Sequence, residues 1–136
     1  MNRKTAIFGL VLACLGMVFY LFLSAEPQPE GFEALTAVQA QTQMAVAPDA
    51  VILDIRTPGE FAAGHIEGAV NIDYYAPDFE SRLAALDRNA EYFVYCRSGN
   101  RSGKAMDVFS RLGFTRVKHL SNGIIDWEGA GLPLVR

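Results

Sequence analysis

The chain has 136 residues, with 12 Lys and Arg against 15 Asp and Glu, which gives a formal net charge of -3. This length allows one domain with a short appendage and excludes two full domains, and the charge gives no sign of a basic surface for nucleic acid. Two cysteines are too few for a disulfide scaffold, and a hydrophobic content of 51% excludes a disordered protein.

The first 25 residues differ from the rest of the chain, because 18 of them are hydrophobic. Arg3 and Lys4 precede an uncharged run, residues 6–23, whose length as a helix is about 27 Å, close to the thickness of a bilayer core. Residues 1–25 are therefore predicted to be an N-terminal membrane anchor or a signal peptide cleaved after Ala25, with the anchor favoured. Cys14 follows a sequence that only loosely resembles a lipoprotein cleavage box.

Both interpretations predict the same orientation, because basic residues before a hydrophobic segment stay in the cytoplasm. We therefore expect the rest of the chain to be exported, to the periplasm or the extracytoplasmic face of the cytoplasmic membrane. Residues 26–31 contain two prolines and are predicted to be a linker, and residues 32–136 are predicted to be one domain.

Strands in this domain are expected where short runs are apolar, aromatic or β-branched, and helices where apolar residues recur at helical spacing. In chain order we expect a short edge strand over 32–35, a helix from the capping box of Thr36 and Gln39 to about Met44, a strand over 51–53, a helix over 78–86, a strand over 92–95, a helix over 102–112, a strand over 117–120 and a short helix over 124–127. This alternation predicts an α/β fold with a central parallel sheet and helices on both faces.

Cys96 directly follows the predicted strand 92–95, and a polar loop separates it from the next helix. Ligands of such folds bind at the carboxyl ends of the strands. Ser102 is expected to be the N-cap of that helix, and Gly99 and Asn100 to tolerate left-handed backbone conformations. Backbone N–H groups would then form an anion-binding nest beside Arg97 and Arg101, which favours a thiolate. The loop therefore predicts a nucleophilic cysteine with a cradle for a substrate's negative charge.

Other kinds of site fit the residues less well. An inert buried cysteine is the ordinary alternative, but two arginines, a glycine and no large apolar residue follow Cys96 within six positions. A P-loop is excluded because GxxxxGK[ST] is absent, and a dithiol redox site because there is no CxxC. No metal is expected, because Cys96, His65 and His119 lack ligand spacing.

Three segments, in this order, resemble the single-domain rhodanese sulfurtransferases, and together they make the resemblance span roughly residues 32–136. They are DIRTPGEFAAGHIEGAVNI (54–72), CRSGNRS (96–102) and NGIIDWEGAGLPL (122–134). The second is a common form of the family's active loop. In the third, Asn122 replaces the first glycine of a pair, and asparagine tolerates the same backbone region.

The resemblance implies a rhodanese-like fold and a sulfurtransferase. Cys96 would take a sulfane sulfur from a donor such as thiosulfate, hold it as a persulfide and pass it to cyanide or a thiol. The loop N–H groups would hold the persulfide, Arg97 and Arg101 would bind the donor's anionic end, and no metal or organic cofactor is implied. The implied site has Cys96 as the catalytic residue and the following substrate-binding residues: Arg97, Ser98, Gly99, Asn100, Arg101 and Ser102.

Two other functions remain open for this loop. One is a rhodanese-fold module that carries or senses sulfur, or binds a partner, without turnover. The other is a phosphatase or arsenate reductase, for which the loop is short: related families use Cys-x5-Arg, whereas Arg101 follows Cys96 at Cys-x4-Arg. A tighter nest suits a sulfur atom better than a tetrahedral oxyanion. The expected partners are small molecules and, if residues 6–23 are retained, a membrane; nucleic acid is not expected.

Other conspicuous polar and aromatic residues are interpreted as structural. Asp54, Arg56 and Glu60 are candidates for a charge network, and His65 for a structural histidine. Trp127 and the pair Tyr74 and Tyr75 are expected in packing or at a surface loop, and whether a tyrosine borders the site stays open.

Overall fold

The computed structural model describes residues 31–136. The predicted anchor or signal peptide over residues 1–25, with its hydrophobic run, and the linker through residue 30 lie outside the described residues. Within 31–136, no helix combines the length and the apolar character needed to cross a membrane.

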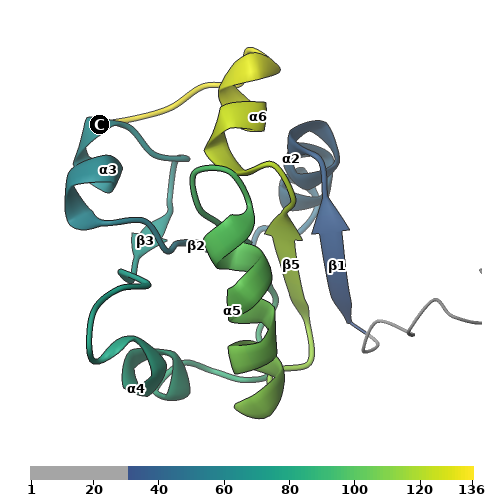
Figure 1. Cartoon of the computed structure of the whole chain (residues 1–136). Coiled ribbons are helices and arrows are strands. Elements are labelled where there is room, and N and C mark those ends of the chain that lie inside the picture. Colours follow the sequence, from purple (N-terminus) through teal and green to yellow (C-terminus); the bar gives the residue numbers. More distant parts are fainter. Residues whose placement is uncertain (1–30) are drawn as a thin grey trace, which may run out of the picture.

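Five strands form one parallel sheet in the order β1-β5-β4-β2-β3 (Figure 1). The strands are β1 (Phe32–Leu35), β2 (Val51–Asp54), β3 (Val70–Asn71), β4 (Tyr92–Tyr95) and β5 (Val117–Leu120). All carboxyl ends therefore meet at one edge of the sheet. The predicted parallel sheet is confirmed, and so is the short edge strand predicted over 32–35, which is β1.

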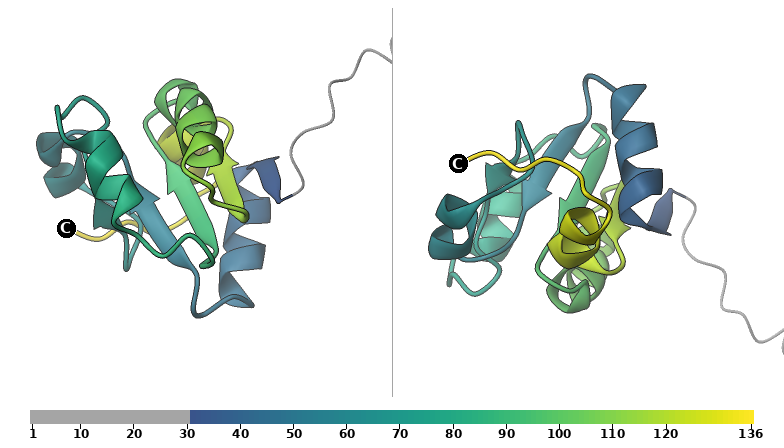
Figure 2. Two further views of the ribbon diagram at one scale, coloured as in Figure 1. Left: turned by 90° about the horizontal axis from the view of Figure 1, so that it is seen from below. Right: turned by 90° about the horizontal axis from the view of Figure 1, so that it is seen from above.

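Helices cover both faces of the sheet (Figure 2). The helices are α2 (Ala37–Ala45), α3 (Pro58–Ala63), α4 (Phe79–Ala84), α5 (Asn100–Arg111) and α6 (Gly123–Gly129). Buried residues of α4 and α5 pack with one face of the sheet, and buried residues of α2 and α6 pack with the other. The predicted covering of both faces is thus confirmed.

The central strand β4 shows why the predicted apolar runs are continuous rather than alternating. Tyr92 and Val94 pack in the layer of α5, whereas Phe93 and Tyr95 pack in the layer of α6, and all four are buried. A strand that is buried on both faces needs an apolar side chain at every position.

The segment between β2 and β4 contains two elements that the sequence analysis did not predict, α3 and β3. Helix α3 has only six residues, too few for a helical repeat of apolar positions, and β3 has only two. A local signal for α3 does exist: Thr57 caps the helix, Pro58 occupies its first position, and Glu60 completes a capping box. The capping box predicted for α2 is confirmed.

Candidate active site

Cys96 lies at the carboxyl edge of the sheet, directly after β4. The loop that follows it leads into α5, the long helix in the centre of Figure 1. The strands β2 and β5 flank β4, so the cysteine is central in the sheet. Only 1% of Cys96 is exposed. The sulfur is therefore buried beneath the loop, within hydrogen-bond distance of its backbone.

Two glycines fix the backbone of this loop. Gly99 has φ +92°, and a Cβ there would lie 1.8 Å from the carbonyl oxygen of Ser121. Gly123 has φ +61°, and a Cβ there would lie 2.3 Å from the carbonyl oxygen of Arg97. The N–H of Ile124 donates to the carbonyl of Cys96 at 2.9 Å. The start of α6 therefore holds the loop in place by direct backbone contact.

Two details of the predicted loop are wrong. Helix α5 begins at Asn100, so its N-cap is Gly99 and Ser102 lies in the first turn. Asn100 does not take a left-handed conformation, because within 31–136 only glycines have positive φ. The left-handed bend falls on Gly99 alone, and α5 therefore begins earlier than predicted. The first N–H groups of α5 lack intrahelical partners and are directed toward the loop. Asn122, which replaces a glycine of the family's motif, also has a negative φ, so its backbone is not strained by carrying a side chain.

The sulfur of Cys96 accepts hydrogen bonds from the backbone of this loop and also contacts the side chain of Ser102. The N–H of Gly99 donates to Sγ at 3.2 Å, and Oγ of Ser102 lies 3.6 Å from Sγ. Burial by itself would raise the pKa of the thiol, but hydrogen bonds from Ser102, Gly99 and Ser98 outweigh it and lower the pKa. The loop therefore favours a thiolate, the form of cysteine that acts as a nucleophile.

Arg101 is bound to a glutamate on α3. Its Nη1 and Nη2 donate to Oε2 and Oε1 of Glu60, both at 2.9 Å, and its guanidinium lies 5.5 Å from the ring centre of Tyr75. The hydrogen bonds from Arg101, with help from Thr57 and against burial, lower the pKa of Glu60 from 4.5 to about 2. Arg101 is thereby fixed beside the loop, and its predicted role in binding the donor stays a prediction.

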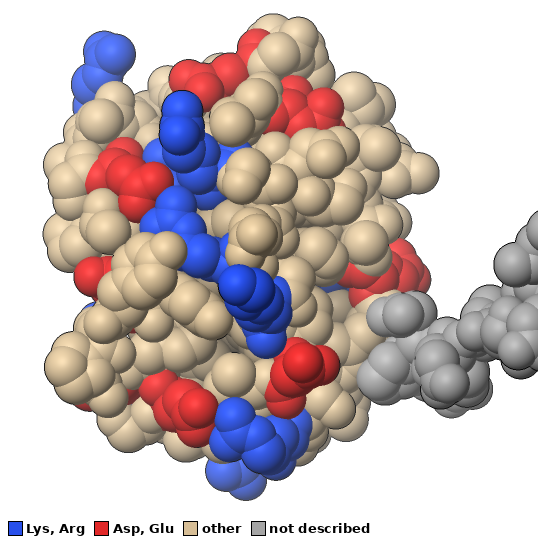
Figure 3. All heavy atoms as spheres, viewed as in Figure 1, with Lys and Arg blue, Asp and Glu red and all other residues tan. Residues whose placement is uncertain are grey.

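Arg97 differs from Arg101, because its side chain is exposed and makes no ion pair with residues 31–136. Lys and Arg side chains gather along the face that α5 covers (Figure 3). The basic residues of the loop and α5 are Arg97, Arg101, Lys104 and Arg111. An anionic reactant that approaches the loop thus meets positive charge, although the molecule as a whole is negative.

The charge network predicted for Asp54, Arg56 and Glu60 is instead two separate ion pairs. Arg56 Nη2 contacts Asp54 Oδ2 at 2.6 Å, and both residues are buried. Arg56 also donates to the carbonyl of Gly64, so this pair holds the segment after β2. Glu60 belongs instead to Arg101, a partner 41 positions away that the sequence analysis missed.

The structural interpretation of the remaining residues agrees with their contacts. The ring of His65 stacks on Phe61, and its Nδ1 lies 2.9 Å from the Phe61 carbonyl oxygen. Trp127 is buried and donates to the carbonyl of Pro133. Tyr75 borders the loop through Arg101, which settles the open question about the tyrosines.

His119 is a second residue that the sequence analysis missed, since it was weighed only as a metal ligand. It lies on β5, and its Nδ1 is 3.1 Å from Oγ of Ser102. No local signal marks this contact, because 17 positions separate the two residues in the sequence.

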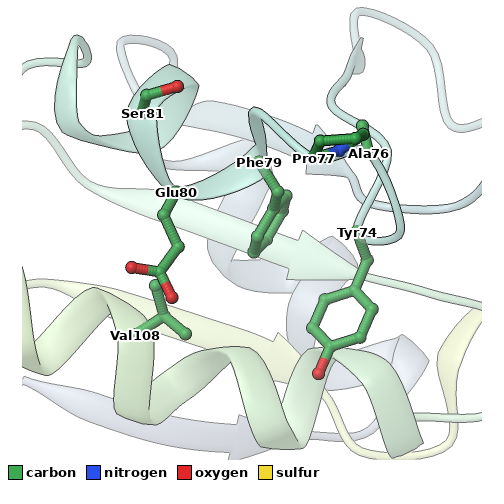
Figure 4. Close-up of a pocket in the computed structure, with 7 residues that line it drawn as sticks. All are labelled: Tyr74, Ala76, Pro77, Phe79, Glu80, Ser81 and Val108. Carbon is green, nitrogen blue, oxygen red and sulfur yellow. The ribbon is translucent and has the colours of Figure 1, made fainter.

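A pocket of about 590 Å³ lies between α5 and the segment that leads into α4 (Figure 4). Its lining residues are Tyr74, Ala76, Pro77, Phe79, Glu80, Ser81 and Val108. None of the residues 96–102 lines it. The reactive group of the described residues is therefore in the loop, outside this pocket.

Comparison with known proteins identifies the family. The sequence model of the rhodanese-like domain matches residues 36–130. The chain is 36% identical over 93 residues to a sulfurtransferase from Allochromatium vinosum, which covers 68% of this chain and 85% of that protein. It is also 34% identical over 111 residues to thiosulfate sulfurtransferase 16, chloroplastic, from Arabidopsis thaliana. That match covers 71% of this chain and 92% of the relative.

The fold agrees with this match. The crystal structure of a rhodanese-related protein from Thermoplasma volcanium superimposes with a TM-score of 0.66 at 29% identity, covering 76% of this chain and 97% of that chain. The loop with its buried cysteine, the family match and the shared fold lead to one conclusion: the chain belongs to the rhodanese-like domain family, which includes relatives named as sulfurtransferases.

Proposed function

We propose that this protein transfers a sulfane sulfur from thiosulfate or a similar anionic donor to cyanide or a thiol, through a persulfide on Cys96. One observation carries the proposal: Sγ of Cys96 lies under the N–H of Gly99 and beside the Ser102 hydroxyl, and these hydrogen bonds lower the thiol pKa despite burial. Relatives named as sulfurtransferases support the general reaction.

The first step loads the cysteine. The thiolate of Cys96 attacks the outer sulfur of thiosulfate, a new S–S bond forms, and sulfite leaves with the electron pair of the broken S–S bond. The outer sulfur of the persulfide then carries the negative charge. N–H groups of the loop and of the first turn of α5 can stabilise this charge, because they have no intrahelical partner.

The second step unloads the cysteine. Cyanide or a thiolate attacks the outer sulfur, the Sγ–S bond breaks, and its electron pair returns to Sγ as a thiolate. With cyanide the product is thiocyanate. We assign Arg97, which is exposed and not committed to an acidic partner among the described residues, to attracting the donor, and Arg101 with Glu60 to holding the loop.

Thiocyanate formation from thiosulfate and cyanide tests this proposal. The wild-type protein and a Cys14→Ser variant are expected to turn over, and Cys96→Ser is expected to be inactive. The Cys14→Ser variant is the matched control, because it removes the other cysteine of the chain. Absence of thiocyanate from the wild type would favour a module without turnover, and vigorous hydrolysis of an aryl phosphate would favour a phosphatase.

We also propose that residues 1–25 place the domain outside the cytoplasm, as an anchor or as a cleaved signal peptide. The hydrophobic run and the preceding Arg3 and Lys4 support this orientation. Expression of the full chain in a Gram-negative host, followed by fractionation and intact mass measurement, separates the two forms. A full-length protein in the membrane fraction indicates an anchor, a periplasmic protein without these residues indicates a signal peptide, and a full-length cytoplasmic protein contradicts the proposal.

A further inference from the structure

The hydroxyl of Ser102 lies between the sulfur of Cys96 and the imidazole of His119. Its Oγ is 3.6 Å from Sγ, 3.1 Å from Nδ1 of His119 and 3.3 Å from the carbonyl oxygen of Gly99. Ser102 is fully buried, so water does not compete for these contacts. A hydroxyl has a single proton, and the partner that receives it depends on what the other neighbours donate.

The surroundings of His119 favour the neutral form of its imidazole ring. Burial lowers the pKa of His119 below its ordinary value. Its register partners across the sheet are Ala34 and Val94, and Gly103 of α5 faces the ring, so none of these three neighbours is charged. Within 31–136, His119 also forms no ion pair with an acidic side chain. A neutral imidazole has one N–H and one acceptor nitrogen.

The second ring nitrogen of His119 indicates where that proton can reside. No residue within 31–136 bonds to Nε2, yet every buried side-chain nitrogen and oxygen of that part of the chain has a partner. Nε2 therefore reaches solvent, where water satisfies it in either tautomer. The tautomer with the proton on Nδ1 is thus compatible with all contacts of the ring.

We propose that His119 is a positioning residue that donates from Nδ1 to Oγ of Ser102 and thereby turns the Ser102 proton toward the sulfur of Cys96. With Nδ1–H donating to Oγ, the serine proton is left for Sγ or for the Gly99 carbonyl. A thiolate is the stronger acceptor because it carries a full charge.

This arrangement has a consequence for sulfur transfer, which rests on the proposed function. When the acceptor attacks the persulfide, the electron pair of the Sγ–S bond returns to Sγ, and the hydrogen bond from Ser102 stabilises the departing thiolate. The same bond stabilises the thiolate that attacks the donor. His119 thus contributes to both steps through Ser102, without touching a reactant.

The pKa of the Cys96 thiol tests this proposal without requiring turnover, so it stays informative even if the proposed function fails. The rate of alkylation by iodoacetamide is measured against pH in a Cys14→Ser background, which leaves Cys96 as the sole thiol. The variants are Ser102→Ala, His119→Phe and the double variant, with His119→Asn as the conservative replacement and His65→Asn as the control. Arg101 and Glu60, the charged pair beside the sulfur, are unchanged in all of them.

We expect His119→Phe and Ser102→Ala each to raise the thiol pKa and to slow alkylation at neutral pH by about threefold to tenfold, the effect of one hydrogen bond. The double variant should behave as Ser102→Ala alone, because His119 acts through that hydroxyl. His119→Asn should restore most of the rate, since its amide can donate from nearly the same place. His65→Asn should leave the thiol pKa as in the wild type.

Three results would overturn the proposal: an unchanged thiol pKa in His119→Phe, additive effects in the double variant, or no recovery in His119→Asn. Thermal unfolding shows whether each variant is folded. If His119→Phe does not fold, His119→Val provides a second removal of the ring with a side chain that suits a strand.

Discussion

Replacing Glu60 with glutamine removes the charge that holds Arg101 but keeps a side chain that can complete the capping box of α3, as Gln39 does in α2. The pKa of Glu60 falls from 4.5 to about 2 on folding, which corresponds to a contribution of at most about 3.4 kcal/mol to the free energy of unfolding. Since 29% of the Glu60 side chain is exposed, solvent screening reduces the expected loss to about 1–2 kcal/mol. Urea unfolding followed by fluorescence of Trp127, the single tryptophan, measures it.

The pH dependence gives this prediction a second readout. A carboxylate whose pKa is lowered by folding stabilises the folded state above pH 4.5, and that contribution is lost as the pH falls from 4.5 toward 2. The wild type should therefore lose more stability in this range than Glu60→Gln. Sulfur transfer should also weaken, because Arg101 no longer has a fixed partner beside the loop.

A matched control uses the second glutamate that pairs with an arginine of α5. Glu80 accepts two hydrogen bonds from Arg111, but that pair is exposed. Glu80→Gln should therefore cost less stability than Glu60→Gln and leave sulfur transfer unchanged. The reasoning is refuted if both variants lose the same stability, or if Glu60→Gln keeps the acid sensitivity of the wild type.

Three further substitutions test other parts of the structure. Gly99→Ala should lower the free energy of unfolding in urea by more than about 2 kcal/mol, because φ at Gly99 is +92° and the new Cβ would meet a backbone carbonyl. The control is Gly59→Ala, whose new Cβ meets nothing within 4 Å and which should not have this cost. Equal stabilities of the two variants would contradict the loop geometry. Arg97→Ala should raise KM for thiosulfate about fivefold with little change in melting temperature, and an unchanged KM would remove Arg97 from the site. Asp54→Ala should cost about 3 kcal/mol or more, since it leaves Arg56 buried without its partner, and a neutral result would contradict the role of that pair.

The main features of the fold could be predicted because they depend on local signals. The apolar run 51–53 indicates a buried strand and the aromatic and β-branched residues 92–95 indicate another, and such strands alternate with longer helices in the sequence. The loop of Cys96 was predictable for the same reason, since the cysteine, the glycine and the arginines lie together within seven residues.

The rest depends on contacts between distant residues. Helix α3 is too short to show a helical repeat, and the start of α5 is set by Gly99, whose left-handed bend replaces the predicted serine cap. The partner of Arg101 is 41 positions away in the sequence, and His119 reaches the loop only because β5 lies beside β4. Such partners are determined by the order of the strands, which the amino-acid pattern of each segment does not reveal.

The central claim is that Cys96 carries a sulfur atom, and the intact mass of the full chain after treatment with thiosulfate tests it most directly. The wild type and Cys14→Ser should each gain one sulfur atom that a small thiol removes, and Cys96→Ser should gain none. An unchanged mass in the wild type, or a sulfur that is still gained by Cys96→Ser, would contradict the account.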